Sequence, residues 1–190
     1  HVLTFNAQYL LAMNALRAGK PRHAEPMLEQ LLALQRAAYA QPTRETLQTL
    51  QGLAEAKLAN SDLGAARELA RQAMEETRVV LGDGSPELAM AYSQIGTAAF
   101  ADGVYDEAAS AYTEARERYR RLYGEDATAF NIVTGNLADA LRESGQIKQA
   151  LQLQQEALRG TEQSDPPQPM RMAPRLSNYA RTLVMAGRAE

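Results

Sequence analysis

The chain has 190 residues, a length that suits one domain or at most two. Its net charge of −3, from 20 Lys and Arg against 23 Asp and Glu, excludes the basic footprint of a nucleic-acid-binding domain. The absence of cysteine excludes disulfides and thiol chemistry, and no apolar run approaches the roughly 20 residues that span a bilayer. The sequence leaves the compartment undetermined, with the cytoplasm favoured.

Apolar residues at helical spacing predict pairs of helices along the whole chain. Hydrophobic residues make up 45% of it and aromatic residues 6%, with no Trp, so the core is expected to consist of Ala and Leu. The predicted helices cover 2–17 and 22–39, then 43–58 and 63–81, then 86–101 and 105–122, then 126–141 and 147–158, and lastly 174–186.

Capping residues mark several of the predicted helix starts. Thr43 is a suitable N-cap for the second pair, and Ser85 followed by Pro86 and Glu87 is typical of an N-cap, a first-turn proline and an early acid. Asp126 is the expected cap of the fourth pair. These signals place the helix starts independently of the hydrophobic pattern.

Four prolines interrupt the pattern, at Pro166, Pro167, Pro169 and Pro174. They forbid a continuous helix there, so the second helix of the fourth pair is expected to end near 158–160. The segment is either a loop that replaces helix ends or a linker at a domain boundary. The first interpretation is preferred because the phase of the pattern is kept beyond it.

Small residues that form turns recur every 42 positions, at Gly19, Ser61, Gly103, Gly145 and Gly187. Other columns of the same register agree, which distinguishes a repeat from a coincidence of glycines. Five positions after the turn residue, every complete repeat has alanine, and seven positions before it four repeats have alanine and one has glycine: Ala24, Ala66, Ala108 and Ala150, then Ala12, Ala54, Gly96, Ala138 and Ala180. Small side chains at these sites let two helices pack closely.

The pattern resembles the tetratricopeptide repeat, with small residues at Gly96, Ala108 and Ala115, the turn at Gly103 and an aromatic at Tyr105. That repeat usually has 34 residues, and the longer 42-residue form resembles the repeats of kinesin light chains and their bacterial relatives. The resemblance implies an all-α fold, a right-handed superhelical solenoid of antiparallel helix pairs with about 4.5 repeats.

The resemblance covers the entire chain and implies a single repeat domain over 1–190. The expected repeats are 2–40, 43–82, 85–124 and 126–165, followed by a half repeat at 172–190. Because the sequence begins at His1 rather than Met and stops shortly after Gly187, we expect it to be a segment of a longer protein.

In this family the first helix of each pair lines a concave groove, which gives a candidate peptide-binding site. The groove positions carry polar side chains at Gln94, Thr97, Asn136, Asp139, Arg142, Asn178 and Arg181. A carboxamide offers a donor and an acceptor and can hold a peptide backbone whatever its side chains, and the charged residues would select the charge of the ligand. The alternative is a solvated groove whose ligand is another part of the same protein. Some tetratricopeptide domains hold the C-terminal carboxylate of a chaperone with Lys, Arg and Asn from their first three repeats. The basic residues of that set are missing here.

The chemical candidates are weak, so no enzymatic activity, metal or cofactor is expected. His23 beside Glu25 lacks the three or four ligands of a metal site. The 82–85 segment, Gly-Asp-Gly-Ser, lacks the rest of a P-loop or EF-hand and is better explained as a turn between repeats. The arginines of 116–121 alternate with glutamates, which favours a surface of salt bridges.

The sequence therefore predicts a non-catalytic module for binding a protein or peptide, without nucleic acid or membrane contact in this segment. Two alternatives stay open. One is the sensory or regulatory region of a larger bacterial signalling protein, such as a Ser/Thr kinase or transcription regulator. The other is self-assembly as a homo-oligomer through the apolar face of the last helix, which contains Leu176, Tyr179 and Leu183.

Overall fold

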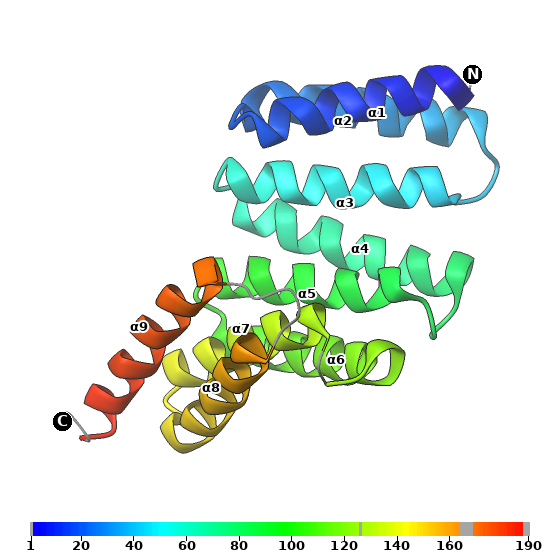
Figure 1. Ribbon diagram of the computed structural model, residues 1–190. Helices are drawn as coiled ribbons and strands as arrows, with labels where there is room; N and C mark the ends of the chain where they lie inside the picture. Colours follow the sequence, from blue (N-terminus) through cyan, green and yellow to red (C-terminus); the bar gives the residue numbers. More distant parts are fainter. Residues whose placement is uncertain (1, 126, 164–168, 188–190) are drawn as a thin grey trace. The chain divides into compact units, whose positions relative to one another are not determined.

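The computed structural model describes residues 2–125, 127–163 and 169–187, and within these ranges every regular element is a helix (Figure 1). This confirms the all-α repeat fold that the periodicity predicts. The helices are α1 Val2–Arg17, α2 Pro21–Ala38, α3 Arg44–Ala59, α4 Leu63–Leu81, α5 Pro86–Ala101, α6 Tyr105–Tyr123, α7 Thr128–Glu143, α8 Ile147–Glu162 and α9 Pro169–Met185.

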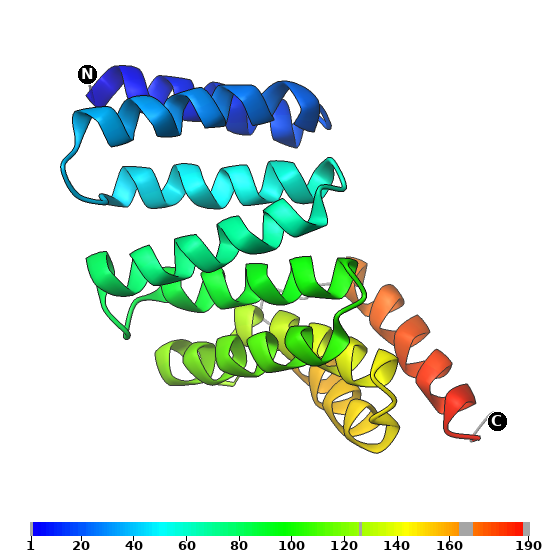
Figure 2. The same ribbon diagram turned by 180° about the vertical axis from the view of Figure 1, so that it is seen from behind.

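The helices form two compact units, residues 1–98 and 99–190, which are described separately. In the first unit α1 packs on α2, α2 on α3 and α3 on α4, and successive helices run antiparallel (Figure 2). In the second unit α6 packs on α7, α7 on α8 and α8 on α9. Within each unit these helices therefore pack mainly on their neighbours in sequence, as in a repeat solenoid.

The turn residues of the 42-residue register all have left-handed backbone conformations. Their φ angles are 69° at Gly19, 64° at Ser61, 76° at Gly103, 85° at Gly145 and 71° at Gly187. At Gly103 the backbone N–H bonds to the Phe100 carbonyl and the next N–H, of Val104, bonds to Ala99. This is the Schellman pattern that ends a helix. The prediction that the glycines occupy equivalent turns is confirmed.

The alanine column that follows each turn forms the centre of the helix packing. Ala24, Ala66, Ala108 and Ala150 are at most 1% exposed. In the column seven positions before each turn, Ala180 is exposed, whereas the other members are buried. Ala180 lies on α9, after which the described residues contain no second helix. The small residues of both columns are thus buried on α1 to α8.

One predicted cap and one predicted helix start are confirmed. The side chain of Thr43 accepts a hydrogen bond from the backbone N–H of Thr46, whose hydroxyl in turn accepts one from Thr43 N–H, and together they form a capping box at α3. α5 begins at Pro86, directly after Ser85. Asp126 lies outside the described residues.

The prediction around the prolines needs correction. α8 continues to Glu162 instead of ending near 158–160, and α9 begins at Pro169 instead of 174. A proline is compatible with the first helical position because an N–H there has no partner within the helix. Pro174 lies inside α9 and removes one of its backbone hydrogen bonds. Pro166 and Pro167 lie outside the described residues.

Candidate functional site

The first unit contains a cavity of about 300 Å³ lined by α3, α4 and α5. Gln94 and Thr97, both predicted groove residues, lie in its wall. The Thr97 hydroxyl donates to the carbonyl oxygen of Ser93 at 2.9 Å, whereas Oε1 of Gln94 is buried and has no hydrogen-bond partner within the described part of the chain. The complete lining is Ala54, Glu55, Leu58, Ala66, Ala70, Gln94, Thr97 and Ala98.

The second unit contains a cavity of about 230 Å³ where α7, α8 and α9 meet. Three predicted groove residues line it, namely Asn136, Asp139 and Asn178. The rest of the wall is formed by residues outside the predicted groove positions. The complete lining is Ile132, Gly135, Asn136, Asp139, Gln154, Ala157, Met170, Pro174, Arg175 and Asn178.

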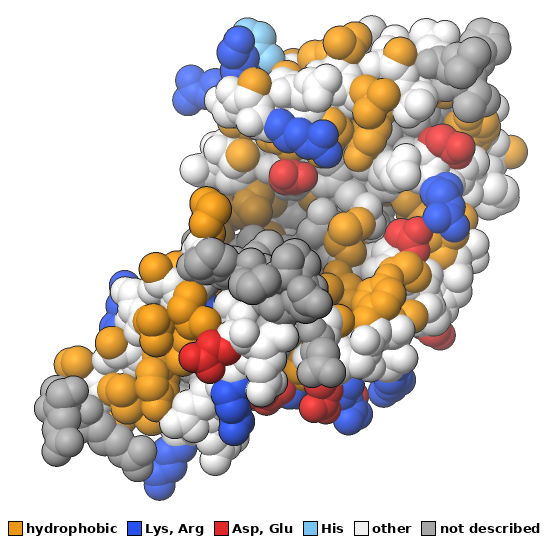
Figure 3. Space-filling view, in the orientation of Figure 1, with side chains coloured by type: hydrophobic (Ala, Val, Ile, Leu, Met, Phe, Trp, Pro, Cys, Tyr) orange, Lys and Arg blue, Asp and Glu red, His pale blue; other side chains and the backbone are white. Residues whose placement is uncertain are grey.

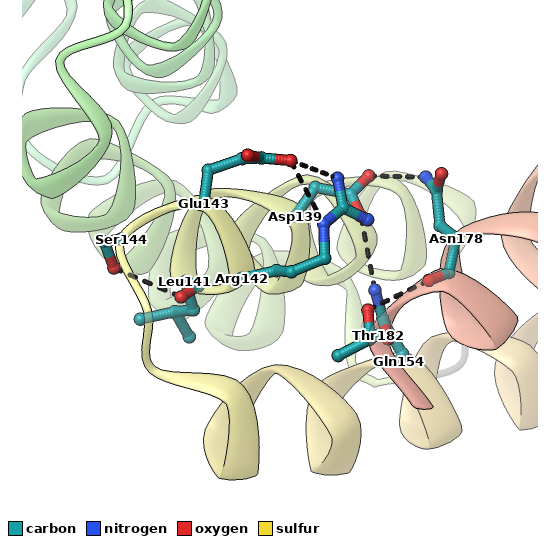
Figure 4. A network of polar contacts seen from close by, with 8 residues as sticks. All are labelled: Asp139, Leu141, Arg142, Glu143, Ser144, Gln154, Asn178 and Thr182. Atoms are coloured by element: carbon teal, nitrogen blue, oxygen red, sulfur yellow. Dashed lines mark hydrogen bonds and ion pairs between the residues drawn. The ribbon is translucent and has the colours of Figure 1, made fainter. Parts of the chain in front are cut away.

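The carboxylate of Asp139 connects the three helices of this unit (Figure 4). Its Oδ1 accepts hydrogen bonds from Nη1 of Arg142 at 3.1 Å and from Nε2 of Gln154 at 3.3 Å. Its Oδ2 accepts one from Nδ2 of Asn178 at 2.7 Å. One side chain on α7 therefore holds a residue of α8 and a residue of α9.

Burial controls the electrostatics of this network. Desolvation raises the pKa of Asp139 above its ordinary value of 3.8, although Arg142, Gln154, Arg175 and Arg181 act to lower it. The Arg142 guanidinium is shared with Glu143, whose Oε1 lies 2.7 Å from Nη2. The neighbouring positive charges thus only partly compensate the loss of water around the carboxylate.

Two glycines in the second unit provide space for polar side chains of neighbouring helices. A Cβ at Gly135 would collide with the guanidinium of Arg175, which donates from Nη2 to the backbone carbonyl of Asn131 at 2.8 Å. A Cβ at Gly160 would collide with the side chain of Asn131, which is 4% exposed. These close approaches fix α9 and α8 against α7.

Five of the seven predicted site residues thus line the two cavities. The other two do not. Arg142 is buried, with only 3% of its side chain exposed, and its guanidinium is occupied by Asp139 and Glu143. Arg181 is exposed on α9 and lies outside the cavity lining. Arg142 therefore holds Asp139 in place instead of presenting a charge to the surface.

Sequence reasoning missed Gln154 and Arg175 because it considered only the groove columns of the first helices. Both are outliers in their own columns. Gln154 stands nine residues after the turn, where the other repeats have the buried residues Leu28, Ala70 and Tyr112. Arg175 stands twelve residues before the turn, where they have Ala7, Thr49, Ala91 and Val133. A polar residue in an otherwise small or apolar column is the signal that identifies them.

The remaining candidates have structural roles. The hydroxyl of Ser85 donates to the carbonyl of Gly82 at 3.0 Å within the turn between α4 and α5. The basic segment of α6 forms salt bridges as predicted, including Arg116 with Glu156 at 2.5 Å and Arg120 with Glu117 at 2.9 Å. The described residues contain no group of three His, Asp or Glu that could hold a metal ion. No helix within the described residues is both long and apolar enough to cross a membrane.

Hydrophobic side chains gather on the exposed surface of α9 (Figure 3). Leu176, Val184 and Met185 are 51%, 63% and 53% exposed. Of the face that the sequence predicts, Leu176 is exposed, while Tyr179 and Leu183 are half-buried. The hydroxyl of Tyr179 accepts a hydrogen bond from Nε2 of Gln155 on α8 at 2.7 Å.

Comparison with known proteins now identifies the repeat. The sequence profile described as Tetratricopeptide repeat matches residues 45–121 and 87–163, together more than half of the chain. The chain belongs to the tetratricopeptide repeat family. Tetratricopeptide repeats typically serve as protein-interaction scaffolds and are generally non-catalytic. No curated protein matches the sequence.

Solved structures with the same tetratricopeptide fold include BtubC (BKLC) from P. vanneervenii, with a TM-score of 0.83 and 18% identity over 96% of this chain and 72% of that one. Nearly identical TPR-like repeats assigned to a kinesin light chain of Podosopora anserina give a TM-score of 0.83 and 23% identity, covering 98% of this chain and 89% of that one. At these identities the likeness shows the fold. It agrees with the kinesin-light-chain-like repeats that the 42-residue spacing suggests.

Proposed function

We propose that this chain is a non-catalytic interaction module that binds extended segments of a partner protein in the cavities of its two units. The observation that supports the proposal is the position of the carboxamides. Gln94 in the first unit, and Asn136 and Asn178 in the second, occupy the same position of successive repeats, and each lines a cavity of its unit. Because a carboxamide both donates and accepts, repeated carboxamides suit the repeated N–H and C=O groups of a peptide backbone.

The hydrogen-bonding state of these residues distinguishes their roles. Oε1 of Gln94 is buried without a partner and gains a hydrogen bond if a ligand N–H reaches it. Asn178 is already bonded to Asp139, so its substitution also disturbs the docking of α9. Arg181 is exposed on α9 and acts electrostatically on Asp139 of the second cavity. It takes the role of selecting ligand charge that the sequence assigns jointly to Asp139, Arg142 and Arg181.

The test uses peptides selected from a randomised library on the immobilised chain. We expect the double variant Gln94→Ala and Asn136→Ala to bind the selected peptides at least tenfold more weakly, because about 1 kcal/mol is lost with each hydrogen bond. Gln152→Ala is the matched control, since Gln152 is exposed on α8 and lies outside the lining of both cavities. An unchanged affinity in the double variant, or a library without a selected peptide, would overturn the proposal.

Self-association is a second candidate, and the exposed Leu176, Val184 and Met185 on α9 support it. Sedimentation at increasing concentration tests it. We expect a dimer that Leu176→Glu together with Val184→Glu returns to monomer. A strict monomer at high concentration would contradict self-association.

A further inference from the structure

Gln154 is the starting point, because it is a polar residue buried beside the cavity of the second unit. Its side chain is 4% exposed and lines that cavity. Nε2 donates to Asp139, which fixes the orientation of the amide because a carboxylate accepts only from the nitrogen. Among the residues that the structure describes, none donates a hydrogen bond to Oε1. A buried acceptor without a donor is costly, and such a group in a native structure calls for an explanation.

The other polar groups of the cavity define the complementary ligand. From the described residues, Oδ1 of Asp139 accepts two hydrogen bonds, whereas Oδ2 accepts one, from Asn178, and retains a second lone pair. Two acceptors, Oε1 of Gln154 and Oδ2 of Asp139, are thus available to a ligand with two N–H groups. Asn136 lines the same cavity and offers an N–H donor to a ligand carbonyl.

We propose that the cavity between α7, α8 and α9 receives the primary carboxamide of an asparagine or glutamine side chain in the bound segment. Its NH₂ group donates to Gln154 and Asp139, and its carbonyl accepts from Asn136. The inference rests on the proposed function and adds a side-chain preference to it. The predicted groove positions do not include the whole of this subsite, because Gln154 belongs to the second helix of its repeat.

Charge and size favour a neutral side chain. The cavity wall contains both the carboxylate of Asp139 and the guanidinium of Arg175, so a ligand of either charge meets a like charge. A ligand carboxylate also has no N–H to donate to Oε1 of Gln154 or Oδ2 of Asp139. The volume of about 230 Å³ lies below the roughly 300–1,000 Å³ of pockets for larger small molecules. The cavity therefore suits one neutral polar side chain.

The first experiment probes the cavity without knowledge of the partner. N-acetylglutamine N-methylamide is titrated into the ¹⁵N-labelled chain, and the signals of Gln154 and Asn178 are followed by NMR. We expect saturable shifts with a Kd on the order of 1 mM, a realistic value for so small a ligand. The glutamate and methionine analogues are expected to bind at least fivefold more weakly. Equal shifts with all three compounds would overturn the inference.

Variants assign the binding to named groups. Gln154→Met removes the polar atoms at nearly constant volume and is expected to weaken binding of the glutamine compound at least fivefold, while Gln152→Met on the exposed face of the same helix leaves it unchanged. Asn136→Ala removes the donor to the ligand carbonyl without altering the Asp139 network and is expected to weaken binding similarly. If both cavity variants bind as the wild type does, the inference fails.

The selected peptides separate this inference from the proposed function. If peptides bind and share an Asn or Gln at one position, and if the preference disappears in Gln154→Met, both are supported. If peptides bind without such a position, the carboxamide subsite is overturned and the interaction module stands. If the glutamine compound binds the cavity but no peptide is selected, the carboxamide selectivity stands and the peptide-binding function is overturned.

Discussion

Asn178 on α9 donates a hydrogen bond of 2.7 Å to Oδ2 of Asp139 on α7, and this contact connects two helices that are not consecutive in the sequence. Both residues occupy groove positions of adjacent repeats. Asp139 also binds Gln154 of the intervening helix. A charged residue selected as a surface position is therefore the junction of three helices in the second unit.

The raised pKa of Asp139 predicts an unusual pH dependence. The native chain binds this proton more tightly than the unfolded chain does, so the contribution of Asp139 to the free energy of unfolding falls as the pH rises from 3.8 through the folded-state pKa. We expect the difference in unfolding free energy between the wild type and Asp139→Asn to move in favour of the wild type as the pH is lowered from neutrality toward 4. Urea unfolding of both proteins across this range measures it. A difference that moves the opposite way would show that the ion pair with Arg142 outweighs burial.

The surroundings of two helical glycines predict opposite effects of alanine. Gly64 in the first turn of α4 has nothing within 4 Å of an added Cβ, so Gly64→Ala is expected to stabilise the chain by up to about 1 kcal/mol through helix propensity. Gly160→Ala gains the same propensity but collides with the buried Asn131, and a net loss of roughly 1–3 kcal/mol is expected. Thermal unfolding of the pair compares them. A stabilising Gly160→Ala would mean that Asn131 moves at little cost.

The fold could be predicted from sequence because its signals are local and repeated. Turn residues at a fixed spacing and alanines in register specify the helix ends and the close contacts, and each repeat supplies the same information again. Helix ends near prolines were harder to place. Pro169 is the first residue of α9, where a missing backbone N–H costs no hydrogen bond, but the sequence alone does not show that the helix starts there.

The candidate site could be predicted only in part, because its geometry depends on contacts between different helices. Asn136 and Asn178 were found from their column. The burial of Arg142 was not, since an arginine is normally exposed and only Asp139 and Glu143 make its burial possible. Gln154 acquires its significance from the carboxylate that it meets across the helix pair, which no single column contains.

The left-handed backbone at the turns predicts opposite effects on stability for two reciprocal substitutions, at Ser61 and Gly103. Ser61 has a φ of 64°, which is strained for a residue with a side chain, whereas Gly103 has a φ of 76° in the equivalent turn. Ser61→Gly is expected to stabilise the chain by about 1 kcal/mol, and Gly103→Ser to destabilise it by a similar amount. Within the described residues, no atom lies within 4 Å of an added Cβ at Gly103. The change in stability of Gly103→Ser therefore reports backbone strain and not a steric clash. Chemical denaturation measures both, and a shift of the same sign in the two variants would contradict this account of the register.

The last prediction concerns the ion pair that joins α2 to α3. Nζ of Lys57 lies 2.6 Å from Oε1 of Glu25, and Asn60 donates to the other oxygen of the same carboxylate. These hydrogen bonds lower the pKa of Glu25 below its ordinary value of 4.5. The stabilisation is therefore present above pH 4.5 and is lost as the pH falls through the lower folded-state pKa.

We expect Glu25→Gln to destabilise the chain by roughly 1 kcal/mol at neutral pH, an estimate that allows for the partial exposure of the pair. Glu29 also approaches Lys57, at 3.0 Å, but its side chain is 51% exposed, so the control Glu29→Gln is expected to have a smaller effect. Urea unfolding at neutral pH and well below pH 4.5 tests both expectations. The difference between wild type and Glu25→Gln should shrink in acid, because protonation then removes the same charge from the wild type. A difference that persists unchanged would mean that packing, and not the ionised carboxylate, stabilises the contact between α2 and α3.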